Sequence, residues 1–443
     1  MEHMKTGLSD IQIHLPLAKI DLNTLIDERV KDDPRLERHL QRACRVTGQR
    51  AIRFPSVWED TNTLAASSAL RIFEENPALD VSKLRYLTAG TESGVDHSKP
   101  VASFVEGMLQ EAGVNIPESI STFQVQHACA AGTLSLLSVS ALLSAAGRAD
   151  ESGLVVCSDV ARYESHSTAE VTQGAGSVSL LVENEAQLME LDLRTQGYSS
   201  KDVDDFFRPL GSKVAVVKGT YSMRCYKESL ESAFMDHCRR RGELPEEVLA
   251  GTDLFVLHTP FRNLPETSMF SLLENHMGLD KSQAKGFLEE RGFYDGIDPI
   301  GDIGNLYTGA VYVNLAFALK SLHERYGDEI VGKNVLLASY GSGNTMIVIR
   351  GTVAEGAAAV IGRWDLASHL ENSRDATFDE YEHWVAGPYE PTGLNLDPNR
   401  DESIKPYFAL ESVREDGYRE YAVRKRINTE QKSKTPIHLF RSA

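Results

Sequence analysis

Residues 123 to 135 read Phe-Gln-Val-Gln-His-Ala-Cys-Ala-Ala-Gly-Thr-Leu-Ser, and no residue from Ala128 to Gly147 carries a full charge. A β-like run over residues 121 to 126 therefore meets Cys129 directly before a long, uncharged helix. This order places a thiol at the edge of a sheet, where the helix begins. The unpaired N–H groups and the positive dipole end of a helix favour a thiolate. The pattern predicts a nucleophile at Cys129.

The predicted helix is rich in Ala, Ser and Gly, so other elements can approach it closely on every side. This predicts a buried helix at the centre of a layered protein. Cys129 and the uncharged run that follows it also allow two other interpretations. A cysteine before a helix is commonly a small buried hydrophobic residue. The uncharged run, at ~20 residues, is also close to the length of a membrane span, but its composition is too weakly apolar and favours a core helix.

The 443 residues are enough for two or three domains, or for one large duplicated domain. A net charge of -18 argues against nucleic acid or an anionic membrane as the main partner. The five cysteines form no CxxC pair and no His-Cys cluster, which argues against zinc and fits a reducing compartment. The N-terminus lacks the pattern of a signal peptide, so a cytoplasmic location is expected.

Strands and helices alternate along the chain, which predicts an α/β architecture. A helix is predicted over Thr61 to Glu75, capped by Thr61 or Thr63, because apolar residues recur there at helical spacing. A further helix is predicted over residues 99 to 110, and a charged helical stretch over residues 28 to 42. The continuous apolar run Leu154 to Ser158 is typical of a strand covered on both faces.

The pattern of the first half recurs late in the chain. A glycine turn at residues 174 to 176 leads into a predicted strand at 177 to 182, and a second turn at 341 to 343 separates predicted strands at 334 to 339 and 345 to 349. Leu254 to Leu257 ends before His258 much as Leu84 to Ala89 ends before Glu92. We therefore expect an internal duplication, with halves at residues 1–209 and 210–443. Residues 199 to 208 are expected to form a loop. Beyond Gly351 the chain is acidic and loop-rich, and its tail (residues 424 to 434) is basic.

Four side chains follow predicted strands: Glu92, Cys129, His258 and Asn305. Ligands of open α/β sheets bind at such strand ends. Taken singly, Glu92 can cap a turn, His258 can be a satisfied core histidine, and Asn305 can be a helix N-cap. A cysteine, a histidine and a carboxylate arriving together favour acyl transfer through a thioester, with a base for carbon-acid chemistry.

The sequence resembles the 3-hydroxy-3-methylglutaryl-CoA synthases of the thiolase superfamily. Eight segments, in the family order, carry the resemblance: Gly90-Thr-Glu-Ser-Gly-Val-Asp96, Gln126-His-Ala-Cys-Ala-Ala-Gly132, Ser158-Asp-Val-Ala-Arg-Tyr163, Thr172-Gln-Gly-Ala-Gly176, Asp205-Phe-Phe-Arg-Pro209, His258-Thr-Pro-Phe261, Gly304-Asn-Leu-Tyr-Thr-Gly309 and Ser339-Tyr-Gly-Ser-Gly343. The resemblance implies a thiolase-like α/β fold, with two duplicated halves in a layered α-β-α-β-α arrangement.

The resemblance also implies a ping-pong mechanism. Cys129 would carry an acetyl group, Glu92 would take a proton from its methyl group, and His258 would hold an oxygen of the acceptor. The implied substrate-binding residues are Thr172, Phe207, Tyr221, Arg262, Asn305, Tyr307 and Ser342. Acetyl-CoA and acetoacetyl-CoA are the implied substrates, feeding isoprenoid synthesis. No metal or redox cofactor is implied, and members of the superfamily are usually dimers paired through the sheet.

Two departures from the family pattern bear on the substrate. The segment after Phe261 carries one arginine, Arg262, and one acidic residue where lysines that meet coenzyme A phosphates are expected. Ala130 stands where many members carry tyrosine. A second hypothesis therefore keeps the chemistry but uses acyl-carrier-protein substrates, as in polyketide β-branching. A non-catalytic thiolase-fold protein and a ketoacyl synthase are further alternatives, which the combination of Glu92, Cys129 and His258 disfavours.

Overall fold

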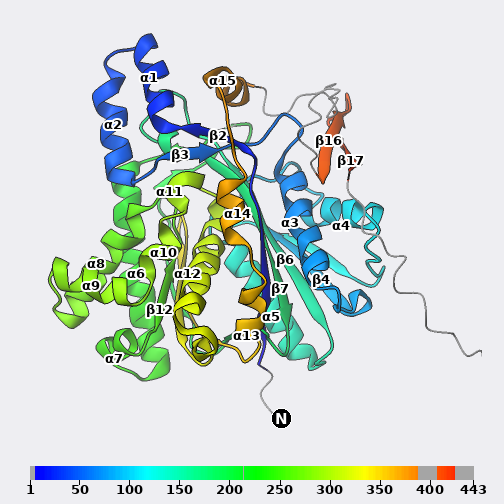
Figure 1. The fold of residues 1–443 in the computed structure, drawn as a ribbon, viewed down its shortest axis with the longest axis vertical. Coiled ribbons are helices and arrows are strands. Elements are labelled where there is room, and N and C mark those ends of the chain that lie inside the picture. The colour runs from blue at the N-terminus through cyan, green and yellow to red at the C-terminus, as the bar shows by residue number, and fades with distance from the viewer. Residues whose placement is uncertain (1–4, 213, 388–406, 425–443) are drawn as a thin grey trace, which may run out of the picture.

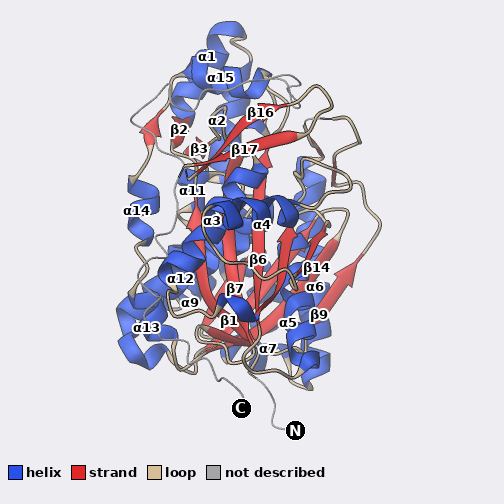
Figure 2. Ribbon diagram, turned by 90° about the vertical axis from the view of Figure 1, so that its right-hand side faces the viewer, coloured by secondary structure: helices blue, strands red, loops and turns tan. Residues whose placement is uncertain are grey.

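The computed structural model describes residues 5–212, 214–387 and 407–424, and one mixed sheet of ten strands runs through it (Figures 1 and 2). The strands follow one another in the order β12 (Leu254–Leu257), β13 (Asn334–Gly341), β14 (Thr345–Val353), β8 (Met189–Leu191), β1 (Gly7–His14), β7 (Gly174–Glu183), β6 (Ser152–Ala161), β4 (Leu84–Gly90) and β5 (Ser121–Val125). The tenth strand, β9 (Gly197–Ser200), pairs with β14.

The directions of strand pairing repeat within this sheet. In the first part, β1 is antiparallel to β7, β7 is antiparallel to β6, and β6 is parallel to β4. In the second part, β9, β14, β13 and β12 pair with the same succession of directions. Strand β8 pairs with both β1 and β14 and so joins the parts into one sheet. The division of the chain at residue 209 stays a prediction.

Helices lie on both faces of each part and between the parts. Helices α5 (Ala131–Ala146) and α12 (Ala310–Tyr326) share one core with Val155 of β6 and Val335 of β13. The next residues along these strands belong to two separate cores. Val156 lies under α3 (Thr61–Glu75) and α4 (Val101–Glu111), and Leu336 lies under α6 (Gly219–Arg241) and α8 (Asn263–Met277). Because neighbouring strand residues point to opposite faces, the layers run α-β-α-β-α. The fold class is as expected.

The run from Ala128 to Ala146 is long and apolar enough to cross a membrane by length and composition. Here it contains the core helix α5. The Thr133 hydroxyl lies 2.9 Å from the Tyr312 hydroxyl of α12 and donates to Ser339 of β13 at 2.9 Å. This helix therefore links both parts of the sheet.

Several local predictions are confirmed and others are wrong. Helix α3 (Thr61–Glu75) has the predicted bounds, but its cap is Asp60, whose carboxylate accepts from two N–H groups of the first turn. Helix α4 (Val101–Glu111) lies within a residue or two of the prediction. The charged stretch forms two helices, α1 (Leu22–Asp32) and α2 (Leu36–Thr47). The glycines at 174 to 176 are not a turn but part of β7.

The predicted loops hold more structure than expected. Within residues 199–208, β10 (Phe206–Phe207) pairs with β11 (Val216–Val217). Beyond Gly351 the chain forms helices and a hairpin of β16 and β17, and residues 425–434 of the basic tail lie outside the described ranges. The remaining elements are β2 (Ala18–Asp21), β3 (Ala51–Arg53), α6 (Gly219–Arg241), α7 (Pro245–Ala250), α8 (Asn263–Met277), α9 (Lys281–Glu290), α10 (Phe293–Ile297), α11 (Ile300–Ile303), α13 (Ala357–Gly362), α14 (Leu366–Glu371), β15 (Arg374–Asp375), α15 (Phe378–Ala386), β16 (Phe408–Val413) and β17 (Arg419–Val423).

Candidate active site

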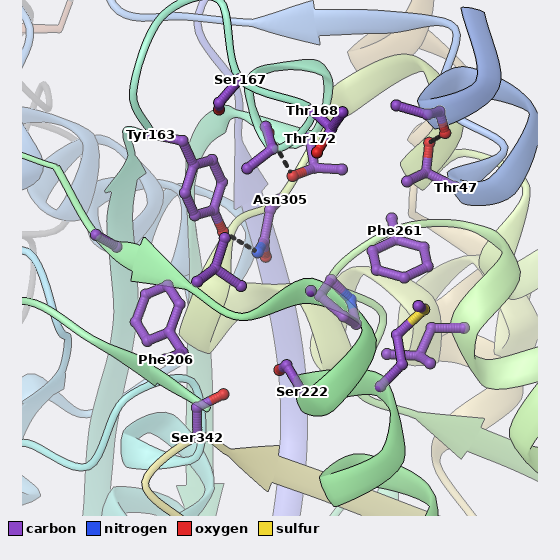
Figure 3. A pocket seen from close by; sticks show the side chains of 18 of the residues that line it. Thr47, Tyr163, Ser167, Thr168, Thr172, Phe206, Ser222, Phe261, Asn305 and Ser342 are labelled. Atoms are coloured by element: carbon purple, nitrogen blue, oxygen red, sulfur yellow. Dashed lines mark hydrogen bonds between the residues drawn. The ribbon is translucent and has the colours of Figure 1, made fainter. Parts of the chain in front are cut away.

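A cavity of about 620 Å³ opens where strands of both parts of the sheet end. Six of the predicted site residues line it: Cys129, Thr172, His258, Asn305, Tyr307 and Ser342. Tyr163, Phe206 and Tyr226 line it as well. Figure 3 shows Tyr163, Thr172 and Asn305 grouped on one side, with Phe206 and Ser342 on another. The structure thus brings together side chains that lie more than 200 residues apart in sequence.

Cys129 and Glu92 are in direct contact. The Cys129 thiol donates a hydrogen bond to Oε1 of Glu92 over 3.1 Å. Ala128 just before it has a φ of 42°, a left-handed conformation that is uncommon for a residue with a Cβ atom. This turn carries the chain from the end of β5 into α5, and strained residues of this kind cluster at functional sites. Cys129 itself is 7% exposed.

Asp159, near the end of β6, fixes the loop that carries Glu92. Its buried carboxylate accepts hydrogen bonds from the hydroxyl of Thr91 at 2.8 Å and from the N–H of Glu92 at 2.9 Å. Its other oxygen accepts from the N–H of Thr308, which precedes α12. One side chain therefore ties together the loops of both parts of the sheet. Asp159 is not among the predicted site residues, although an aspartate at the end of an apolar strand is a signal in the sequence.

Burial and neighbouring charge set the protonation of the Cys129–Glu92 pair. Burial, reinforced by the negative charge of Asp159, raises the pKa of Glu92 to about 8. Burial raises the pKa of the Cys129 thiol well above its usual range, and the Glu92 carboxylate raises it further. The prediction that the start of the helix favours a Cys129 thiolate is therefore wrong for the protein without substrate. Cys129 precedes the N-cap of α5, Ala130, and burial with nearby carboxylates outweighs the helix dipole.

His258 follows β12 directly and is held by its backbone. Its N–H donates to the carbonyl of Ala338 in β13 over 2.7 Å, and its own carbonyl accepts from the Tyr226 hydroxyl. Burial lowers the pKa of His258 to about 3, so the imidazole is neutral at physiological pH. Its Nδ1 atom has no hydrogen-bond partner among the described residues. A neutral, buried imidazole can offer an N–H to an oxygen of a bound substrate.

Asn305 lies in the turn before α12, where the chain passes close to β7. Its side-chain amide donates to the Tyr163 hydroxyl at 3.3 Å, and its side-chain oxygen accepts from the N–H of Tyr307 at 2.8 Å. A Cβ atom on Gly174 would lie 2.6 Å from the backbone of Asn305, so glycine is needed there. Asn305 is not the N-cap of the helices that follow, which begin after Leu306 and Gly309, so the capping alternative is wrong. Its amide remains directed toward the cavity wall at Tyr163 (Figure 3).

Three predicted binding residues do not line the cavity. Phe207 is 42% exposed, and its neighbour Phe206 lines the cavity instead. Tyr221 packs beside Arg224 on the first turns of α6. Arg262 is bound to carboxylates, at 2.8 Å from Asp298 and at 3.2 Å from Glu266.

Among the described residues, no group of three or more His, Cys, Asp and Glu side chains could hold a metal ion. The groups of the site that can take part in acyl transfer are Cys129, His258 and Asn305, which line the cavity, and Glu92, which does not line it but accepts the hydrogen bond from Cys129. These groups supply a thiol, a carboxyl with a raised pKa, and neutral hydrogen-bond donors.

Comparison with known proteins gives consistent results over most of the chain. Residues 5–187 match the family model of the hydroxymethylglutaryl-coenzyme A synthase N terminal, and residues 299–423 match that of its C terminal. The hydroxymethylglutaryl-CoA synthase of Haloferax volcanii is 29% identical over 366 residues, covering 74% of this chain and 81% of the relative. A solved structure of MvaS in complex with 3-hydroxy-3-methylglutaryl coenzyme A is 30% identical, with a TM-score of 0.79, and covers 94% of this chain and 99% of that one.

A second solved structure is the curacin biosynthetic pathway HMG synthase in complex with holo donor-ACP. It is 20% identical, has a TM-score of 0.81, and covers 94% of this chain and 99% of the other. At this identity the likeness shows the fold alone.

Proposed function

This chain belongs to the hydroxymethylglutaryl-CoA synthase family of condensing enzymes, and we propose that it joins acetyl-CoA to acetoacetyl-CoA and releases 3-hydroxy-3-methylglutaryl-CoA after hydrolysis. The observation that carries the proposal is the hydrogen bond from Cys129, which lines the cavity together with His258 and Asn305, to the carboxyl of Glu92. A thiol can hold the acetyl group while a carboxyl beside it handles the proton of the acetyl methyl group.

In the first half-reaction, the Cys129 sulfur forms a bond to the acetyl carbon, and the bond to the coenzyme A sulfur breaks. The thiol proton ends on the departing coenzyme A. In the second, ionised Glu92 takes a proton from the methyl group of the acetyl-enzyme, and the carbon adds to the ketone of the acceptor. Glu92 returns that proton to the new alkoxide. Water then cleaves the thioester to Cys129.

His258 and Asn305 serve as neutral donors in this scheme. Because the pKa of His258 is lowered to about 3, it can donate a hydrogen bond to a developing oxyanion without itself carrying charge. Asn305 and Ser342 line the same cavity and offer further donors to acyl oxygens.

A second candidate keeps this chemistry but uses substrates bound to an acyl carrier protein. It is favoured by Arg262, which is neutralised by Asp298 and Glu266 and does not line the cavity, so it is not free for a coenzyme A phosphate. Intact-mass spectrometry after mixing with acetyl-CoA, and separately with acetylated carrier protein, tests both. Acetylation from acetyl-CoA supports the first candidate, acetylation from the carrier alone supports the second, and acetylation from neither overturns both.

We also propose that the chain works as a homodimer. The sheet ends at β5, whose residues are partly or fully exposed, and the adjacent helix α5 leaves Leu142 42% exposed. An open strand edge of this kind is usually covered in the native assembly.

A further inference from the structure

A second cavity, of about 570 Å³, is lined by residues at the end of β1, in α3, in α14 and directly after α14. It shares no lining residue with the first cavity. Its volume falls within the range of small-ligand sites. Its polar and charged lining residues include His14, Arg71, His369, Glu371, Asn372 and Arg374.

Arg71 is the central charge of this cavity. Its guanidinium lies over the Tyr407 ring, 5.5 Å from the ring centre. Its Nε atom is buried and has no hydrogen-bond partner among the described residues. A buried donor without an acceptor is costly, and a charged one more so. An anion in the cavity would supply the acceptor.

A second guanidinium lies behind the cavity wall. Arg53 is 1% exposed and donates to the backbone carbonyls of His369 at 3.0 Å and Leu370 at 2.9 Å. These bonds fix the segment that carries His369, but a carbonyl does not neutralise the charge of a guanidinium. Burial lowers the pKa of Arg53 to about 10, and Arg53 remains cationic at physiological pH.

Of the carboxylates nearby, Glu59 faces His14 on the cavity wall, and Glu380 and Glu371 are paired or exposed. Glu59 lies 3.8 Å from His14 and accepts from the N–H of Ser56. Glu380 binds Arg374 through both oxygens. Glu371 is exposed at the rim, and the charge of Asp365 raises the pKa of His369, against the effect of burial.

Both histidines are affected mainly by burial. Burial lowers the pKa of His369 to about 3, and the positive charge of Arg71 lowers it further. Burial also lowers the pKa of His14, against the opposing effect of Glu59.

We propose that this cavity binds a small anion of the phosphate or carboxylate class, with the Arg71 guanidinium as its charged anchor and the imidazoles of His14 and His369 as further donors. Guanidinium geometry suits both kinds of oxyanion. The site is separate from the condensation chemistry and does not depend on it.

Isothermal titration of the full-length protein with inorganic phosphate and, separately, with citrate tests the site at constant ionic strength. We expect saturable binding of at least one anion, and the tighter of the two identifies the class. Loss of a charged hydrogen bond in Arg71→Gln should weaken that binding about 10- to 100-fold. Arg363→Gln, at an exposed arginine after α13, is the matched control and should bind as the parent does.

A second variant gives a second readout. Loss of one hydrogen-bond donor in His369→Gln should weaken binding of the same anion by up to about 10-fold. His369→Gln also decides the question if Arg71→Gln does not fold. Absence of saturable binding for both anions, or unchanged affinity in the variants that fold, overturns the proposal.

Discussion

The proton between Cys129 and Glu92 is the central feature of the site at the scale of single residues. Each group shifts the pKa of the other. The Glu92 carboxylate raises the pKa of the thiol, and the hydrogen bond from the thiol lowers the pKa of Glu92. The two steps of the proposed reaction therefore place opposite demands on Glu92. Its negative charge opposes formation of the thiolate for acylation, yet the same charge is required for the condensation.

This opposition predicts different fates for the two half-reactions in Glu92→Gln. Acetylation of Cys129 should persist, because removing the carboxylate lowers the pKa of the thiol. Condensation should fall by about 10²- to 10⁴-fold, the usual contribution of a general base. Intact-mass spectrometry reports the first and product formation the second. Cys129→Ala is the control and should carry no acetyl group. An unacetylated Glu92→Gln protein would contradict the assignment of roles.

The raised pKa of Glu92 also predicts the pH dependence of the condensation. The base is the ionised carboxylate, and below a pKa of about 8 most of the carboxyl is protonated. Single-turnover condensation from the acetyl-enzyme should therefore accelerate as pH rises through about 8. The negative charge of Asp159 contributes to this pKa, so Asp159→Asn should move the acidic limb to lower pH. A limb that stays in place in a folded Asp159→Asn protein would show that burial alone sets the pKa.

At the scale of elements, the close packing around α5 explains its small residues. A Cβ atom on Gly132 would lie 2.5 Å from the Cys157 sulfur of β6, and one on Gly341 would meet the backbone of His127 at 2.5 Å. The start of α5 therefore lies directly against strands of both parts of the sheet. Larger residues here would move Cys129 away from Glu92.

Gly132→Ala should accordingly destabilise the protein by about 1–3 kcal/mol, the usual cost of overpacking a core. The free energy of unfolding in urea measures this. Gly107→Ala is the matched control, because Gly107 lies in α4 with open space around it. Alanine in a helix is favoured over glycine by about 0.5–1 kcal/mol, so this variant should be as stable as the parent or more so. Equal stability of the two variants would contradict the packing argument.

The same elements show how far the sequence predicts the structure. Continuous apolar runs and apolar residues at helical spacing are local patterns, and they predict β12 and α3 with their observed bounds. The cap of α3 was missed because Asp60 and Thr63 act reciprocally, and only geometry shows which of them accepts from the backbone of the first turn. The glycines of β7 were assigned to a turn because a close approach by Asn305, over 100 residues away, leaves no local pattern.

Some residues of the site can be predicted from the sequence and others cannot. Cys129 and His258 follow the ends of β5 and β12, whereas Asn305 follows helix α11 and not a strand, contrary to the prediction. The fold brings all three to one cavity. Phe206 was missed in favour of Phe207 because two adjacent aromatic residues look alike in sequence, while alternate strand residues face opposite sides. The partner of Arg262 could not be predicted, since Asp298 lies 36 residues further along the chain.

At the scale of the whole molecule, the sheet has an open edge at β5, which a second copy of the chain could cover. Strand β5 pairs with β4 on one side, and the order of the sheet ends there. This same strand leads directly to Cys129, so an unsupported edge would leave the nucleophile on a frayed element. A second copy that pairs with β5 would extend the sheet and bury the outer face of α5, including Leu142.

Light scattering of the full-length protein should therefore give the mass of a dimer. Leu142→Asp places a charge in the proposed interface and should shift the protein toward monomer, because a buried unpaired charge is costly. Leu244→Asp, at an apolar side chain of similar exposure before α7, should leave the dimer intact. If β5 is held by its partner, acetylation of Cys129 should slow as Leu142→Asp is diluted and its dimer dissociates. A parent protein that is monomeric at micromolar concentration, or acetylation that does not change with the dissociation of Leu142→Asp, would contradict this role of the edge.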